Sequence, residues 1–142
     1  MRCDELMTTN PEVLRLYDDA HDAAIKMRDA KVGFLPVLDD AEQVVGVLTD
    51  RDLAVRVMAE SLPVETGVED LMTIDVIACA PEDDLERAEA LMRANQKSRL
   101  PVVDEDGHLA GVISIADIVQ YEDASRAGDV AGDATAGEVR IP

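Results

Sequence analysis

The chain has 142 residues and a formal net charge of −18, from 31 Asp and Glu residues against 13 Lys and Arg residues. Such an acidic surface repels phosphate backbones and anionic lipid head groups, which argues against nucleic acid and membrane partners. Because the sequence has neither the pattern of a secretion signal nor a run of about 20 apolar residues, it predicts a cytoplasmic protein.

The first half of the chain predicts a strand, a helix, two strands and a second helix. The leading turn CDELMT is followed by an apolar stretch at residues 12–16 that favours a short strand. Apolar residues then recur at helical spacing over 23–30, behind acidic residues typical of a helix start. Two β-rich runs at 34–39 and 43–49 predict antiparallel strands, and a helix begins after Thr49. The apolar positions of this last helix are Leu53, Val57 and Met58.

The second half repeats this pattern 65 residues later. Residues 3–57 align with residues 68–122 without a gap, and 15 of the 55 aligned positions are identical, whereas about one in ten would match by chance. The equivalent strands are expected at 75–80, 99–104 and 108–114. The duplication predicts an α/β (α+β) fold in which two β-α-β-β-α units pack about a pseudo-twofold axis.

The repeats also set the expected domain boundaries. The first unit spans residues 1–61, a connector spans 62–67, and the second unit spans 68–123. From 124 to 142 the sequence mixes Gly, Ala and Asp without periodicity, so this acidic tail is expected to be disordered.

The motif S/T-x-x-D opens the second helix of each repeat, as Thr49 with Asp52 and as Ser114 with Asp117. One interpretation is a capping box, in which the hydroxyl accepts the third helical amide and the carboxylate lies near the positive end of the helix dipole. The other is a ligand site, because a carboxylate in this turn can accept both hydroxyls of a ribose while the hydroxyl and free amides receive phosphate. The spacing alone leaves both interpretations open.

Together the motifs resemble those of tandem cystathionine-β-synthase-type (CBS) domains, with LMT at each leading turn, LPVxD in each hairpin and G-V-[LI]-[TS]-x-x-D at each second helix. The resemblance extends to Glu122 and leaves no catalytic domain, as in the stand-alone CBS pairs, or Bateman modules, of bacteria and archaea. It implies a non-enzymatic, homodimeric regulatory module that binds AMP, ADP, ATP or S-adenosylmethionine between the repeats. The protein partner that would receive the signal is not identified by the sequence.

The resemblance assigns ribose recognition to Asp52 and Asp117, and phosphate contact to Thr49 and Ser114. Family members often read the adenine edge through backbone groups at the positions of Val13 and Ala78. An apolar slot for the base is expected from Gly33, Phe34 and Pro36, with Pro101 at the equivalent place in the second repeat.

The two clefts are expected to differ in charge. Arg51, inside the first motif, either neutralises phosphate or remains a solvated side chain at the helix start. The second motif has Ile115 and Ala116 instead, so phosphate there would depend on Lys97 or Arg99 from the neighbouring hairpin. Arg99 has the alternative of pairing with a nearby acid. The second cleft is therefore expected to hold an uncharged adenosine, a cation such as S-adenosylmethionine, or nothing.

Other chemistry finds little support in the sequence. His21 and His108 belong to no catalytic motif. Cys3 and Cys79 lack the spacing of a zinc site, so we interpret both as reduced apolar residues and expect no metal site. Two alternatives to nucleotide binding stay open, namely a ligand-free dimerising scaffold and a sensor linked to a divalent metal.

Overall fold

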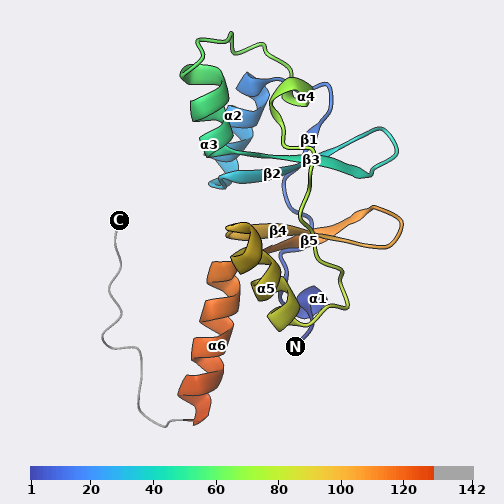
Figure 1. Cartoon of the computed structure of the whole chain (residues 1–142), viewed down its shortest axis with the longest axis vertical. Coiled ribbons are helices and arrows are strands. Elements are labelled where there is room, and N and C mark those ends of the chain that lie inside the picture. Colours follow the sequence, from blue (N-terminus) through green and yellow to red (C-terminus); the bar gives the residue numbers. More distant parts are fainter. Residues whose placement is uncertain (130–142) are drawn as a thin grey trace.

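The computed structural model describes residues 1–129, which form two small lobes stacked along the long axis of the molecule (Figure 1). The remainder of the predicted tail, residues 130–142, lies outside the described residues. In chain order the elements are α1 (Cys3–Leu6), β1 (Leu14–Arg15), α2 (Ala20–Ala30), β2 (Phe34–Leu38), β3 (Val44–Thr49), α3 (Asp50–Asp52), the π-helix η1 (Leu53–Met58), α4 (Val68–Leu71), α5 (Leu85–Asn95), β4 (Arg99–Val103), β5 (Leu109–Ser114) and α6 (Ile115–Asp129).

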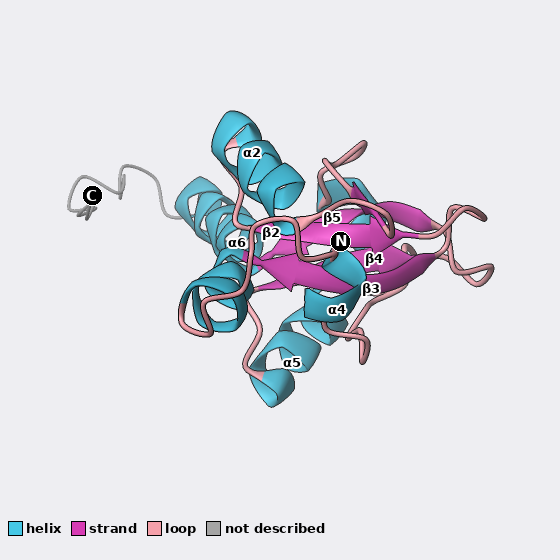
Figure 2. Cartoon of the chain, turned by 90° about the horizontal axis from the view of Figure 1, so that it is seen from above, coloured by secondary structure: helices cyan, strands magenta, loops and turns pink. Residues whose placement is uncertain are grey.

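Each lobe contains one small sheet, and the mixed α+β architecture predicted from the repeats is confirmed. In the first lobe β1 pairs in parallel with β2, and β2 pairs antiparallel with β3. In the second lobe β4 and β5 form the equivalent antiparallel pair. Seen from above, the strands of the two sheets overlie one another and helices flank them (Figure 2). The two hairpins touch, since the amide of Val44 donates to the carbonyl of Gly107 at 3.0 Å.

The first strand of the second repeat is shorter than predicted. Of residues 75–80 only Cys79 pairs with β4, through a single parallel bridge. The chain turns away immediately afterwards, because the carboxylate of Asp83 accepts the amide of Ala80 at 2.8 Å. Pro81 follows and has no amide to add to a ladder. The strand is therefore reduced to one paired residue.

The two short leading segments pack into the core of the opposite repeat. The sequence predicts turns here, but both segments form one-turn helices, α1 and α4. Helix α4 buries Val68 and Leu71 in the first lobe, and α1 buries Cys3 in the second. Figure 1 shows α4 in the upper lobe with α2, and α1 in the lower lobe with α5. Each lobe is thus completed by a segment of the other repeat.

The second helix of the first repeat departs from the predicted period. After one α-helical turn the backbone forms the π-helix η1, in which the amide of Ala59 donates to the carbonyl of Ala54 at 2.9 Å. This wider turn shifts the positions that face the core. Val57 remains buried, whereas Met58, predicted on the apolar face, is 78% exposed.

The second helix of the second repeat is longer than predicted. Helix α6 continues to Asp129, so the expectation of disorder from residue 124 is wrong for residues 124–129. Arg126 lies 4.0 Å from the carboxylates of Glu122 and Asp123, at the i,i+4 and i,i+3 spacings that support a helix. Within residues 1–129 no helix combines the length and the hydropathy needed to cross a membrane.

Candidate functional site

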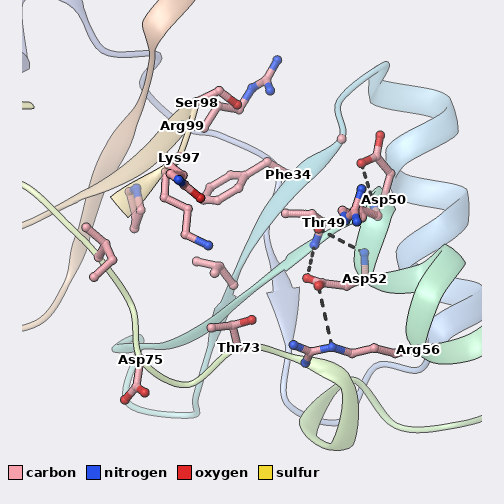
Figure 3. A pocket seen from close by; sticks show the side chains of 16 residues that line it. Phe34, Thr49, Asp50, Asp52, Arg56, Thr73, Asp75, Lys97, Ser98 and Arg99 are labelled. Carbon is pink, nitrogen blue, oxygen red and sulfur yellow. Dashed lines mark hydrogen bonds and ion pairs between the residues drawn. The ribbon is translucent and has the colours of Figure 1, made fainter. Parts of the chain in front are cut away.

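A cleft of about 460 Å³ lies between the two lobes. One wall comes from the first repeat, where β2 begins and where β3 passes into α3 and η1 (Figure 3). The other wall comes from the second repeat, at residues 73–77 and 96–101. Its volume falls in the range of small-molecule sites, roughly 300–1,000 Å³. The cleft is therefore large enough for a nucleotide and is formed by both repeats.

Seven of the predicted site residues line this cleft, and five do not. Those that line it are Gly33, Phe34, Thr49, Arg51, Asp52, Arg99 and Pro101. Those outside its lining are Val13, Pro36, Ala78, Ser114 and Asp117.

The two residues predicted to read the adenine edge, Val13 and Ala78, do not line this cleft, and neither does Pro36 of the predicted base slot. Val13 borders a separate hollow beside the second hairpin, and its carbonyl accepts Nζ of Lys26 at 2.6 Å. Pro36 is buried within β2. On the wall from the second repeat, Ile77 faces the cleft rather than its neighbour Ala78.

Thr49 and Asp52 form both bonds of a capping box. Oγ1 of Thr49 accepts the amide of Asp52 at 3.1 Å, and Oδ2 of Asp52 accepts the amide of Thr49 at 2.9 Å. The other carboxylate oxygen, Oδ1, lies 3.8 Å from Nε of Arg56. The capping interpretation is confirmed for this motif. It does not exclude a ligand, because the Thr49 hydroxyl retains a proton to donate and the carboxylate retains unused lone pairs.

The backbone amides at the start of α3 are already engaged. The amide of Asp50 donates to the carbonyl of Gly33 at 3.0 Å, that of Arg51 to Oδ1 of Asp50 at 2.8 Å, and that of Asp52 to Thr49. The expectation that free amides here receive phosphate is therefore wrong for these three. Gly33 makes room for the arrangement, since a Cβ there would lie 2.6 Å from Oδ2 of Asp50.

Positive charge is concentrated in the cleft. Four of the chain's 13 basic residues line it, Arg51 and Arg56 from the first repeat and Lys97 and Arg99 from the second. The acidic residues that accompany them are Asp50, Asp52 and Asp75. The lining therefore has one positive charge in excess, in a chain whose net charge is −18.

The wall from the second repeat carries two basic side chains that were expected at the second motif. Lys97 and Arg99 were expected to serve the second motif, but both line the cleft of the first motif, on the wall opposite Thr49 (Figure 3). The ring of Phe34 extends between the two walls. Any anion in this cleft therefore lies between side chains of both repeats.

The lining residues that were not predicted include Arg56, Thr73, Asp75 and Ile77. Arg56 stands four residues after Asp52, a spacing at which an acid and a base pair on a helix, so the sequence did contain a signal for it. The other three reach the cleft because α4 packs into the first lobe, an exchange that no sequence motif marks.

The second motif is built differently. The amide of Asp117 donates to Oγ of Ser114 at 3.0 Å, but among the described residues no return bond joins the Asp117 carboxylate to the Ser114 amide. Tyr121 stands 65 residues after Arg56, so Asp117 has no equivalent of the Arg56 ion pair. The two motifs are therefore unequal in more than the charges predicted.

Other reactive groups of the described residues have structural explanations. Both cysteines are free and buried in the second lobe, and burial raises the pKa of both thiols, that of Cys79 to about 12. Protonated thiols are poor nucleophiles and poor metal ligands.

Asp104, Asp106 and His108 come together at the tip of the second hairpin. There the amides of Asp106 and His108 donate to Asp104, so turn bonds account for the grouping.

A family model described as CBS domain matches residues 3–59 and 68–123. The uncharacterized protein YlbB of Bacillus subtilis (strain 168) is 33% identical over 138 residues, which cover 96% of this chain and 93% of that protein.

Solved structures share the arrangement of both lobes. The crystal structure of CBSX2 in complex with AMP superposes with a TM-score of 0.78 at 29% identity, covering 88% of this chain and 98% of that one. The CBS domain pair of protein MJ0100, in complex with 5′-methylthioadenosine and S-adenosyl-L-methionine, gives the same TM-score and coverage at 21% identity. At that identity the second comparison supports the fold alone.

Proposed function

The chain belongs to the CBS domain family, and on that premise we propose that it is a non-catalytic, cytoplasmic regulatory module that binds an adenine nucleotide in the cleft between its repeats. We propose further that it acts as a homodimer and passes the signal to a protein partner. The AMP complex of the related CBSX2 supports the ligand class.

The net charge of the cleft lining is the observation from which we choose among the candidate ligands. An excess of positive charge in a strongly acidic chain favours an anion over the uncharged or cationic members of the candidate set. AMP, ADP and ATP carry phosphate, whereas S-adenosylmethionine carries a sulfonium cation. We therefore rank the three nucleotides above S-adenosylmethionine for this cleft.

Each group of the cleft has a proposed role. Because the first amides of α3 are engaged, phosphate would rest on the side chains of Arg51, Lys97 and Arg99. Asp52 would accept the sugar hydroxyls, and Phe34 would cover the base.

Because these side chains come from both repeats, a bound nucleotide would tie the two walls together. Binding shifts an equilibrium only by its differential affinity for two states, and closing of the walls would supply that difference.

Thermal unfolding of extensively dialysed protein tests the proposal. AMP, ADP, ATP, S-adenosylmethionine and GMP are each added to the wild type, Asp52→Asn and Asp117→Asn. A ligand at 100 times its Kd stabilises by about 2.7 kcal/mol, which raises Tm by several degrees. We expect an adenine-nucleotide shift that Asp117→Asn retains and Asp52→Asn loses. A shift with none of the ligands would contradict nucleotide binding and leave the capping box as the sole role of the first motif, in a ligand-free scaffold.

A further inference from the structure

We propose that Arg56 is a positioning residue for this site: it orients the carboxylate of Asp52 and so sets the preference for a ligand with both ribose hydroxyls. The inference rests on the proposed nucleotide site and adds a residue to it. Arg56 is not part of the S/T-x-x-D motif, and it acts on the ligand through Asp52.

The guanidinium of Arg56 joins two parts of the cleft. Its Nε lies 3.8 Å from Oδ1 of Asp52. One terminal nitrogen donates to the carbonyl of Leu71 at 2.7 Å and approaches that of Met72 at 3.4 Å. Both carbonyls lie at the end of α4, the helix that the second repeat inserts into the first lobe. Arg56 is therefore held by the backbone at the end of α4 on one side, and it reaches the Asp52 carboxylate on the other (Figure 3).

The two oxygens of Asp52 are consequently not equivalent. Oδ2 accepts the amide of Thr49 at 2.9 Å, and Oδ1 faces Arg56. A carboxylate contacted at both oxygens has little freedom to rotate, so its remaining lone pairs keep fixed directions for incoming hydroxyls. The Asp52 side chain is only 18% exposed, against 44% for Arg56. The carboxylate is thus the more enclosed member of the pair.

This arrangement belongs to the first motif alone. Tyr121 occupies the position equivalent to Arg56 and packs against the core of the second lobe. Among the described residues the Asp117 carboxylate also lacks the return bond to the amide of Ser114, so it has neither of the two contacts that orient Asp52. The first cleft therefore has a means of sugar selection that the second motif does not share.

Arg56 also lines the cleft, so direct contact with phosphate is the competing role. The two roles predict different losses. A positioning residue affects every ligand that uses the sugar hydroxyls, phosphorylated or not. A phosphate contact affects only phosphorylated ligands.

Calorimetric binding of AMP, adenosine, 2′-deoxy-AMP and 3′-deoxy-AMP separates these roles. The variants are Arg56→Gln, Arg56→Lys and, as a matched loss of cleft charge inside the motif, Arg51→Gln. We expect wild type to bind AMP about tenfold more tightly than the weaker deoxy analogue, the effect of one hydrogen bond to a charged group. Arg56→Gln should reduce that ratio to about two and weaken AMP and adenosine by the same factor. Arg51→Gln should weaken AMP and leave the ratio unchanged.

Arg56→Lys is the control for a folding defect. Lysine keeps the positive charge and one donor nitrogen, but it lacks the planar guanidinium that reaches both the Asp52 carboxylate and the Leu71 carbonyl. We expect this variant to unfold at a temperature close to that of wild type and to show an intermediate ratio. An unchanged ratio in both Arg56 variants, or a loss confined to AMP, would overturn the positioning role while leaving the nucleotide site intact. Absence of AMP binding by the wild type would overturn the nucleotide site and the inference with it.

Discussion

Thr73 pairs with Val47 across the boundary between the repeats: the amide of Thr73 donates to the carbonyl of Val47 at 2.9 Å, and the amide of Val47 donates back at 3.1 Å. Thr8 and Val112 form the same pair in the other lobe, at 2.8 and 3.1 Å. These bridges hold each leading segment against a strand of the other repeat. They bring residues 73–77 to the wall of the cleft, so the exchange of segments and the site have a common origin.

The glycine beside each bridge should tolerate a methyl group differently. A Cβ at Gly111 would lie 2.6 Å from the backbone carbonyl oxygen of Thr8. At Gly46 the nearest backbone atom, the oxygen of Thr73, would be 3.1 Å away, and the closer atoms belong to the flexible side chain of Met72. Overpacking costs about 1–3 kcal/mol. We expect Gly111→Ala to destabilise by about 3 kcal/mol and Gly46→Ala by about 1 kcal/mol, measured by urea unfolding.

Gly67→Ala is the control for these substitutions, because no atom lies within 4 Å of a Cβ built there. It should show the smallest change of the three. Equal losses for Gly46→Ala and Gly111→Ala would mean that the leading segments shift freely on the strands, contrary to the paired bridges.

The exchange of leading segments shows where prediction from the sequence ends. The 65-residue repeat predicts the order of elements and the sheets of both lobes, because apolar period and hairpin residues are local properties. It does not determine which core receives Leu6 or Leu71, since these residues are identical in the alignment. Packing within a repeat and packing across repeats would leave the same pattern. The residues at 73–77 were missed for this reason.

The caps of the two motifs should contribute unequally to stability. Asp52→Ala removes the bond to the Thr49 amide and the ion pair with Arg56, whereas Asp117 makes no return bond among the described residues. Both aspartates have the same position relative to a helix dipole. Asp52→Ala should therefore cost about 1 kcal/mol more than Asp117→Ala in the free energy of unfolding. Measurement is made without ligand, and equal losses would indicate that the return bond is not maintained in solution.

Alkaline pH should weaken the second lobe through Cys79. Burial raises the pKa of its thiol from 9.0 to about 12. The folded state favours the neutral thiol, so this contribution to stability is complete below about pH 9 and is lost as the pH rises toward 12. We expect the unfolding free energy of wild type to fall more steeply between pH 9 and 11 than that of Cys79→Ala. Parallel pH profiles for the two proteins would argue that the thiol is accessible to water.

Lys97 and Arg99, on the wall from the second repeat, should strengthen phosphate binding because they lie close to the ligand, and not because they change the overall electrostatic field of the protein. Lys97→Gln and Arg99→Gln each remove one charge from the cleft, and Arg87→Gln removes one from an exposed position on α5 outside it. All three variants change the net charge equally, so a purely long-range effect would weaken AMP binding equally in all of them. We expect a loss of about fivefold for each cleft variant and little change for Arg87→Gln, measured by calorimetry.

The ionic strength and the number of phosphates on the ligand should both change the difference in affinity between the cleft variants and wild type. Exposed charges are screened by salt, so raising the ionic strength should narrow the difference between the cleft variants and wild type. Adding phosphates to the ligand should widen it, because ADP and ATP present more negative charge to the same side chains. If AMP, ADP and ATP lose equal affinity in Lys97→Gln and Arg99→Gln, the phosphate chain points away from the second wall. The ligand would then contact the second repeat through residues 73–77 rather than through the start of β4.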